Sequence, residues 1–564
     1  MDSNAFKVYS VFLGLLSHIV CNRYEPSIIG FIASLLPFQA AFYYYASQHL
    51  RSGSLVSLLM QCHILFFVSL GSSMAAYRLL FHPLRRFPGP LLGKLTKFAT
   101  SYHAVRGDQH LWIENLHRKY GDTVRFGPNE LSFINPDDLP YIQGSKSARV
   151  PRGPWYDGSP DRMEDSLSMV RTRNFEVHRY KRRIWEQAFT LPALTSYEPK
   201  VLEMVELAVK VCVEKDGQVI DVKPIIQSFT FDTMGKVGFS RDYGMVDGTN
   251  VHAGREMRSL AEHMRMLFMT RPTPWLKHLY RALPLDAKGK NGSKQFKDTT
   301  LRRFEERYQE GTTNGVIDIM HYLMQPEPKS GKSMTKLELS DEAVSLVIAG
   351  SDTTSVCLTY AFYYLLTNRE AYSKLQKEVD SLWDGVGLLQ SKSLVPSRAP
   401  FIDGVINEAL RLAEPDPNGN QRSTPPGGFM VNGEYIPEGT QMSVHKWSIH
   451  RSEKHFTRGD EFIPERWISD EERARLGLTN HNVKAFIPFG AGQYGCVGRP
   501  LALNELRMFL VGFFRHVDIS PCPGHDLSQF THQAAAYMTF VTPPLPVVIR
   551  RRKVGYQMGQ EIEN

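Results

Sequence analysis

The sequence is poor in cysteine. Only six cysteines occur among its 564 residues, and none of them forms a CxxC pair or a close cluster. Small secreted domains that depend on disulfides use cysteine far more densely, so this composition excludes a disulfide scaffold and is typical of a reducing compartment. Because 42% of the residues are hydrophobic, the chain can fill a large core instead.

The chain also lacks a strong excess of charge of either sign. Its 66 Lys and Arg stand against 58 Asp and Glu, and the positive residues are scattered apart from a run at 550–553. That run is either a solvated face or a docking patch for an acidic partner or anionic lipid. No basic stripe with interleaved aromatic residues accompanies it, so nucleic acid is not expected as a partner.

Formal charge is missing altogether from three apolar runs within residues 1–80. The run at 55–77 is long enough to cross a bilayer, the run at 28–46 is interrupted by Pro37, and the run at 8–21 is short. No small-residue cleavage site stands out, so these runs are expected to remain as a membrane anchor with one to three spans.

Positive residues follow the last apolar run closely, at Arg78, Arg85 and Arg86. Such residues favour the cytosolic side of a membrane, so the rest of the chain is expected in the cytosol. One span or three satisfies that orientation, whereas two spans require a cytosolic N-terminus as well.

Residues 81–95 are rich in Pro and Gly and cannot form a continuous helix. They predict a stiff hinge between the anchor and a single domain at 96–564.

Helical periodicity dominates that domain and predicts, among others, helices at 111–121 and 178–189. Short β-like runs occur at 122–134 and 535–551. The sequence therefore predicts a fold that is mainly α with small β-sheets.

The segment 341–366 predicts a long central helix, with Ser340 as its N-cap and two acidic residues in its first turn. It is apolar nearly all round, which is typical of a buried helix. The polar run from Gly350 to Thr354 interrupts it. This run is either a locally hydrated bend with a satisfied Asp352 or a widened turn where a ligand lies and polar groups handle protons.

One cysteine stands in an unusual setting, the loop FGAGQYGCVGRP at 489–500. Four glycines surround Cys496 and leave backbone N–H groups free to point at its sulfur, which stabilises a thiolate. A lone thiolate without nearby Cys or His does not make a tetrahedral zinc site. It can, however, be the single axial ligand of a haem.

The loop resembles the haem-binding loop of the cytochrome P450 monooxygenases. Three further segments resemble motifs of that family in the same order: AGSDTT at 349–354, EALR at 408–411 and FIPERW at 462–467. The resemblance covers about residues 78–550. It implies the P450 fold, in which haem lies between a long central helix and the cysteine loop.

The resemblance also implies a role for each matched residue. Cys496 is the axial ligand of the iron of haem b, and Phe489, Gly490, Gly492 and Gly498 shape the loop around it. Thr353 and Asp352 serve oxygen activation and relay protons. A structural network of one carboxylate and two guanidiniums is expected from Glu408, Arg411 and Arg466.

For the haem propionates, the resemblance points to His178, Arg182 and Arg422. The sequence departs from the family two residues before the cysteine, where Tyr494 replaces the usual Arg or His. A phenol donates one hydrogen bond but carries no charge near neutral pH, so the other three residues are expected to hold the haem.

No dinucleotide fingerprint or flavin domain is visible in the sequence. The resemblance to membrane-anchored eukaryotic members therefore implies an NADPH-cytochrome P450 reductase as electron donor, with cytochrome b5 as a second candidate. It further implies the endoplasmic reticulum membrane and a lipophilic small molecule as substrate. The expected pocket is apolar and is lined by 154–169, the helix near Ala349, the residues after Pro426, and 535–540.

The N-terminal residues resemble a fungal subgroup that includes tryprostatin hydroxylase-like enzymes of secondary metabolism. Hydroxylation or epoxidation with O2 is the favoured activity, because Thr353 and Asp352 are both present. A haem-thiolate isomerase or dehydratase that works without a reductase is the alternative. A non-catalytic haem protein would have no use for the acid and the alcohol.

Overall fold

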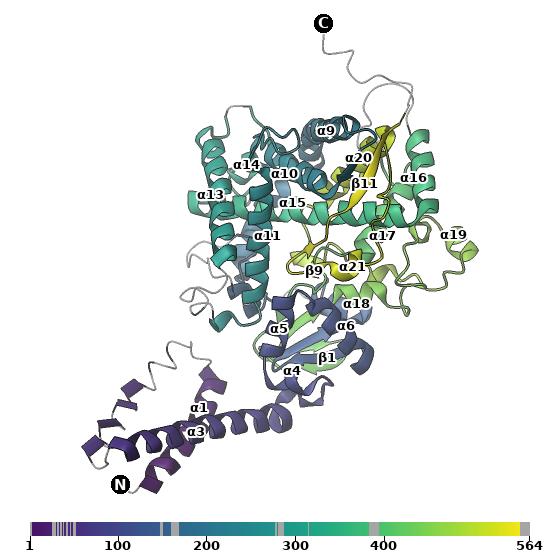
Figure 1. The fold of residues 1–564 in the computed structure, drawn as a ribbon. Coiled ribbons are helices and arrows are strands. Elements are labelled where there is room, and N and C mark those ends of the chain that lie inside the picture. The colour runs from purple at the N-terminus through teal and green to yellow at the C-terminus, as the bar shows by residue number, and fades with distance from the viewer. Residues whose placement is uncertain are drawn as a thin grey trace.

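The computed structural model describes residues 3–24, scattered residues between 30 and 48, and 52–552, with gaps at 147–149, 159–167, 277–286 (Leu279 apart), 314 and 383–393. The chain is mainly helical with small sheets, which confirms the predicted fold class. Two helices project from one end of a large body that holds the remaining elements (Figure 1).

The projecting helices are α1 (Ser3–Tyr24) and α3 (Ser52–Ala76), which continues as a π-helical turn over Tyr77–Phe81. Both are long and apolar enough to cross a membrane, judged by length and composition. They coincide with two of the predicted runs. The third run, 28–46, lies largely outside the described residues.

Residues 81–95 form a 3-10 turn (Pro83–Arg86) and the short helix α4 (Leu91–Leu95). This segment packs onto the body: Leu84 and Phe87 are buried, and the Arg125 N–H donates to the Pro88 carbonyl at 2.7 Å. A Cβ on Gly89 would lie 2.0 Å from the Arg125 carbonyl oxygen, so this close approach requires glycine. The segment is therefore tied directly to the first strand of the body.

The strands form small peripheral sheets, as the β-like runs predicted. One sheet has the order β1-β2-β7-β4, with β2 and β7 parallel and the other pairs antiparallel. A second has the order β3-β11-β8, and two hairpins pair β5 with β6 and β9 with β10. Their bounds are β1 Thr123–Gly127, β2 Glu130–Phe133, β3 Val219–Asp221, β4 Arg422–Ser423, β5 Phe429–Val431, β6 Glu434–Ile436, β7 Gln441–Val444, β8 Val517–Pro521, β9 Ala535–Ala536, β10 Phe540–Val541 and β11 Pro546–Arg551.

Helices make up most of the body. Those expected at 111–121 and 178–189 are present as α6 and α8, and Gly121 ends α6 with a positive φ. The helices of the body are α5 Phe98–Arg106, α6 Gln109–Tyr120, α7 Leu139–Ile142, α8 Phe175–Gln187, α9 Leu191–Val213, α10 Lys223–Phe239, α11 Ala253–Thr270, α13 Ala287–Gln309, α14 Ile319–Leu323, α15 Lys336–Thr367, α16 Arg369–Ser381, α17 Pro400–Leu412, α18 Lys446–Arg451, α19 Asp470–Arg475, α20 Arg499–His516 and α21 Phe530–Gln533.

The central helix is α15, which crosses the middle of the body (Figure 1). The prediction that Ser340 caps it is wrong. Thr335 is the N-cap, and it forms a capping box in which its side chain accepts from the Glu338 N–H while Glu338 binds the Thr335 N–H. This reciprocal pair satisfies two free backbone groups, which a cap at Ser340 would not do, so the helix begins five residues earlier than expected.

The polar run within α15 does not break the helix. At Gly350 the helix lies against α10, and a Cβ there would stand 1.9 Å from the Met234 sulfur. Gly350 therefore serves the close packing of two helices. Its neighbour Ala349 is exposed, in a stretch where most side chains are buried.

We predict that Gly350→Ala destabilises the protein by about 1–3 kcal/mol, because the added methyl group overpacks the contact with α10. Thermal unfolding of the purified protein measures this. The matched control is Gly254→Ala, whose Cβ would approach nothing closer than Arg258 at 3.6 Å. If the two variants unfold at the same temperature, Gly350 does not limit the packing; Gly350→Ala combined with Met234→Ala should recover part of the loss.

Candidate functional site

The loop around Cys496 is held in a fixed shape by its own backbone. The Cys496 N–H donates to the Phe489 carbonyl at 2.9 Å, which closes the loop. Gly490 and Gly492 both have positive φ, and a Cβ on Gly492 would lie 2.2 Å from the Gln143 carbonyl oxygen. The glycines therefore allow a left-handed turn that presses against neighbouring backbone.

The Cys496 thiol lies just before the first turn of α20. Its side chain keeps accessible surface although protein atoms crowd around it, which places the sulfur on the wall of a recess. Burial raises the pKa of the thiol. The backbone N–H groups of Gly498 and Arg499 and the charges of Arg182 and Lys446 oppose that rise. These groups favour the thiolate that a metal ion would bind.

The central helix presents an open face at Ala349 and Thr353, which lie one helical turn apart. The Thr353 hydroxyl donates to the Ala349 carbonyl at 2.7 Å. The helix α20, which begins after the cysteine loop, packs against α15. The open face and the recess thus belong to elements that are packed together.

Asp352 points to a different partner from Thr353. Its Oδ2 accepts a hydrogen bond from the Thr539 hydroxyl, on the turn between β9 and β10. Burial raises the pKa of Asp352 to about 6, while Thr539 and the charge of Lys223 act against the rise. The carboxyl group therefore exchanges protons near neutral pH.

A cluster of arginines surrounds Tyr494. The guanidiniums of Arg152 and Arg422 lie 4.6 and 4.5 Å from the centre of its ring, and the His178 ring lies at 4.5 Å. Arg152 and Arg422 are buried, and the Nε atom of each has no hydrogen-bond partner. Among the described residues, no carboxylate forms an ion pair with either of them.

Two buried cations without a carboxylate are costly unless an anion joins them. Burial lowers the pKa of His178 to about 3, with Arg152, Arg182 and Arg422 adding to the shift, so His178 is neutral and adds no charge. The cluster fits a cofactor that carries carboxylates, and the recess at Cys496 supplies a thiolate ligand. These residues fit haem, whose propionates would meet the arginines.

Arg182 lies beside the cysteine loop, and its charge lowers the pKa of both His178 and Cys496. Its Nη1 donates to the Gly495 carbonyl at 2.5 Å, and its Nε pairs with Glu186 at 2.8 Å. It therefore braces the cysteine loop from α8. Arg152, by contrast, was missed, because a single Arg within a Pro and Gly-rich loop carries no periodic signal.

Glu408 lies fully buried between two guanidiniums. Arg411 binds it through two hydrogen bonds of 2.8 and 2.7 Å, and Arg466 Nε donates to it at 2.9 Å. The Ile463 N–H and the Trp467 indole also donate to it. Burial alone would raise the pKa of Glu408, but the two arginines hold it below its usual value.

The network continues toward the cysteine loop. Arg411 donates to the His450 carbonyl at 2.7 Å, and His450 Nε2 accepts from the Ile487 N–H at 3.0 Å. The Gly490 N–H then donates to the Ile487 carbonyl. A continuous chain of hydrogen bonds thus joins α17 to the loop that carries Cys496.

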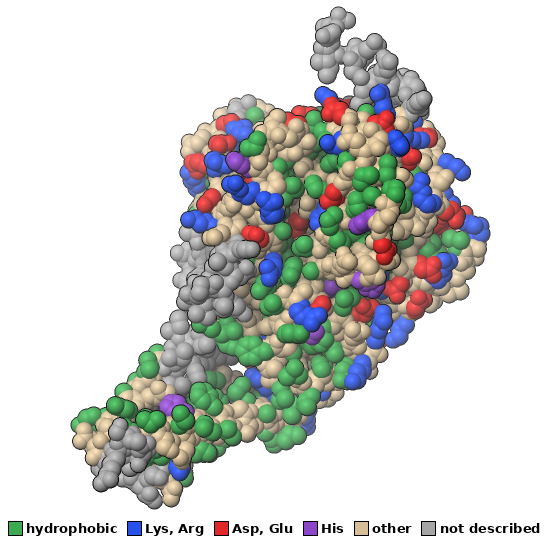
Figure 2. Space-filling view, in the orientation of Figure 1, with side chains coloured by type: hydrophobic (Ala, Val, Ile, Leu, Met, Phe, Trp, Pro, Cys, Tyr) green, Lys and Arg blue, Asp and Glu red, His purple; other side chains and the backbone are tan. Residues whose placement is uncertain are grey.

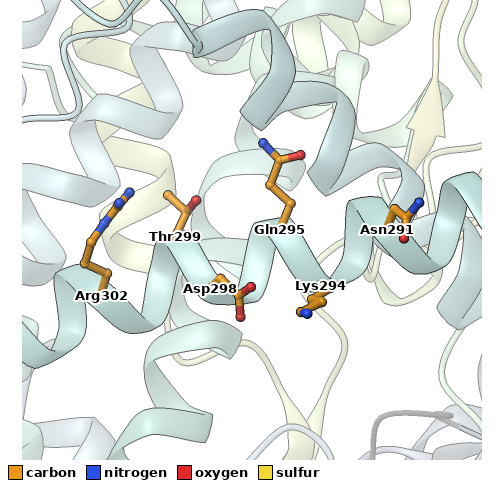
Figure 3. Close-up of a pocket in the computed structure, with 6 residues that line it drawn as sticks. All are labelled: Asn291, Lys294, Gln295, Asp298, Thr299 and Arg302. Atoms are coloured by element: carbon orange, nitrogen blue, oxygen red, sulfur yellow. The ribbon is translucent and has the colours of Figure 1, made fainter.

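A cavity of about 240 Å³ lies apart from these residues, along one face of α13 (Figure 3). Polar and charged side chains line it, and none comes from the cysteine loop, α8 or α15: Asn291, Lys294, Gln295, Asp298, Thr299 and Arg302. It plays no part in the site.

The helical fold, the cysteine loop and the arginine cluster together define a haem-thiolate protein. Comparison with family models matches residues 83–550 to the model described as Cytochrome P450. The chain belongs to the cytochrome P450 family. It is a haem enzyme of the monooxygenase class.

Relatives of known name agree with this assignment. Cytochrome P450 67 of Uromyces fabae is 31% identical over 96% of this chain and 98% of its own length. Cytochrome P450 monooxygenase nodW of Hypoxylon pulicicidum is 33% identical, over 85% of this chain and 84% of its own. Tryprostatin B 6-hydroxylase of Aspergillus fumigatus is 32% identical, over 88% and 85%.

Among solved structures, the haem domain of cytochrome P450DA superposes with a TM-score of 0.66 and 20% identity, over 83% of this chain and 97% of that domain. At this identity the likeness shows the fold alone.

We predict that Arg466→Ala destabilises the protein by about 3–5 kcal/mol, because it leaves the buried Glu408 charge underbonded. Soluble yield and urea unfolding measure the effect. Arg458→Ala is the matched control. The Arg458 guanidinium pairs with the exposed Glu461, so its removal should change the stability little. An Arg466→Ala protein as stable as the Arg458→Ala protein would contradict the prediction.

Proposed function

We propose that this enzyme hydroxylates or epoxidises a lipophilic small molecule of fungal secondary metabolism, using O2 and electrons that a separate NADPH-cytochrome P450 reductase delivers. The observation that carries this proposal is the presence of Asp352 and Thr353 side by side on α15, the helix that packs against α20 directly after the Cys496 loop. The relatives named above as monooxygenases and as a tryprostatin B 6-hydroxylase support it.

Different residues would bind different parts of the haem. Cys496 would ligate the iron through its thiolate, and Arg152, Arg422 and the neutral His178 would meet the propionates. Tyr494 would sit between the two arginines, where its ring stacks on both guanidiniums. When bound, the haem supplies the iron that activates O2, and a thiolate ligand favours cleavage of the O–O bond.

Asp352 and Thr353 would handle the protons. The Thr353 hydroxyl, on the open face of the helix, donates its one hydrogen to the Ala349 carbonyl, and its oxygen can accept a hydrogen bond from the recess. Asp352 exchanges protons near neutral pH and can replace those that the reaction consumes. The isomerase alternative has no such need, and the relatives reported above do not support it.

Of the four segments expected to line the substrate pocket, 154–169 and 535–540 share one cluster, which Phe268 of α11 joins, while residues 159–167 lie outside the described part of the chain. Trp155, Phe268 and Tyr537 form one aromatic cluster, in which the Trp155 and Phe268 rings lie 6.1 Å apart. The residues after Pro426, however, pack elsewhere, because Phe429 and Val431 join the cluster around Leu84. An apolar substrate would therefore contact this aromatic cluster.

We predict that the purified, reduced protein shows a strongly red-shifted Soret band with carbon monoxide, and that Cys496→Ala abolishes this band. The physical reason is that only a thiolate ligand shifts the band in this way. Cys522→Ala, a loop cysteine away from the site, is the control and should keep it. A full shift in the Cys496→Ala protein would exclude this residue as the ligand.

The anchor would place the enzyme on the endoplasmic reticulum membrane, with the body in the cytosol, where the reductase and cytochrome b5 could reach it. Hydrophobic side chains gather over the anchor and over the adjoining part of the body (Figure 2). The exposed apolar residues of α4, α5 and the π turn suit contact with lipid: Leu80, Phe81, Leu91, Leu92, Phe98, Tyr102 and Val105.

The packing of α1 on α3 supports one topology. Contacts run in the same order along both helices: Phe6 clusters with Leu58, a Cβ on Gly14 would lie 2.0 Å from Ser69 Oγ, and His18 binds Ser73 at 2.7 Å. The two helices are therefore parallel. If both cross the membrane, they cross it in the same direction. The chain that joins them must then cross the membrane once in the opposite direction.

We predict that the N-terminus is luminal, which requires three crossings before a cytosolic body. The uncharged run at 28–46 is long enough for the return. A glycosylation acceptor peptide fused to the N-terminus of the full chain should be modified in microsomes, and the same peptide at the C-terminus should not. An unmodified N-terminal peptide, with modification of a luminal reference protein, would overturn this topology.

A further inference from the structure

Thr539 holds the Asp352 carboxyl group from outside the central helix. It is buried at 5% exposure, and its hydroxyl donates to Asp352 Oδ2. The turn that carries it is fixed by the β9-β10 pairing of Ala536 with Phe540 and by a hydrogen bond from the Tyr537 N–H to the Thr539 carbonyl. The hydroxyl is thus presented by a rigid turn.

Lys223, the first residue of α10, reaches the end of the same hairpin. Its Nζ donates to the Thr542 carbonyl at 2.5 Å, and its charge lowers the pKa of Asp352. Asp221 Oδ1 accepts from both the Lys223 and Leu545 N–H groups, which ties the start of α10 to this segment. Among the described residues, no cation lies within ion-pairing distance of Asp352.

Asp352 and Thr353 are adjacent on α15, so their side chains leave the helix about 100° apart. Thr353 lies on the open face with Ala349, whereas Asp352 faces the β9-β10 turn. The two residues therefore lie between the open face of α15 and the hairpin that Lys223 binds at Thr542.

We propose that Thr539 is a positioning residue for Asp352, and that Thr539 and Lys223 form the outer end of the route by which protons reach Thr353. This rests on the proposed function. Asp352 gives its proton toward the Thr353 hydroxyl and, once ionised, accepts a hydrogen bond from Thr539. It takes its next proton from solvent water that enters beside Lys223, whose ammonium group keeps its own protons, so each passage moves one proton and leaves the carboxyl group protonated as it began.

The Thr539 hydrogen bond and the Lys223 charge both favour the ionised carboxylate, whereas burial favours the protonated form. Loss of either contact should therefore raise the pKa of Asp352. A hydrogen bond to a charged group is worth enough to move that pKa by about one unit.

The test titrates Asp352 in the haem-loaded full-length protein without turnover, by the infrared carboxyl C=O stretch that Asp352→Asn removes. Thr539→Val should raise the midpoint by about one unit. Thr539→Ser, which keeps the hydroxyl, should restore it. Thr542→Val removes a hydroxyl from the same segment but leaves the carbonyl that binds Lys223, so it should not move the midpoint.

Lys223→Met should also raise the midpoint, and it provides the second measurement if Thr539→Val fails to fold. An unchanged midpoint in the Thr539→Val protein, or in Lys223→Met where that is the variant measured, would overturn the proposal.

Product formed per NADPH consumed, with the reductase present, is the second readout. Thr539→Val should lower this ratio and release more hydrogen peroxide, and Thr542→Val should leave it unchanged. A shifted midpoint with an unchanged ratio would overturn the proton route. If no substrate is oxidised by the unmodified enzyme, the proposed function fails, and the infrared titration still decides whether Thr539 positions Asp352.

Discussion

The rest of the site depends on one buried carboxylate. Glu408 is enclosed by Arg411 and Arg466, and a charge taken fully out of water is tolerated only when each of its lone pairs is bonded. Because Arg411 also binds the His450 carbonyl and His450 binds Ile487, this network fixes the backbone that leads into the cysteine loop. The ion pairs of Glu408 therefore fix the backbone that positions Cys496, and the glycines of the loop allow the conformation that this position requires.

A second constraint acts at the central helix, where each polar residue faces a different neighbour. Gly350 allows α10 to pack closely against the helix, Thr353 lies on the open face, and Asp352 accepts a hydrogen bond from Thr539. The polar run that interrupts the apolar sequence thus serves packing and proton handling at the same time. A helix that bent at this point could not hold these groups in fixed directions.

Much of this could be predicted from local patterns. Helical periodicity and short β-like runs predicted the mainly α fold, and the resemblance of the Cys496 loop to a known family implied the haem ligand. The helix cap was predicted wrongly because Ser340, Asp341 and Glu342 imitate a helix start, whereas Thr335 and Glu338 form the reciprocal hydrogen bonds that define one.

The sequence by itself determined the elements and their chemistry, since helix periods, turns and glycine-dependent conformations depend on residues a few positions apart. Only the tertiary structure decided that Arg152 joins Arg422 around Tyr494, that Arg182 braces the cysteine loop, and that Thr539 meets Asp352. These partners lie many residues apart along the chain. They meet because the packing of α8, α15 and the small sheets brings them together. That packing cannot be predicted from the spacing of residues along the chain.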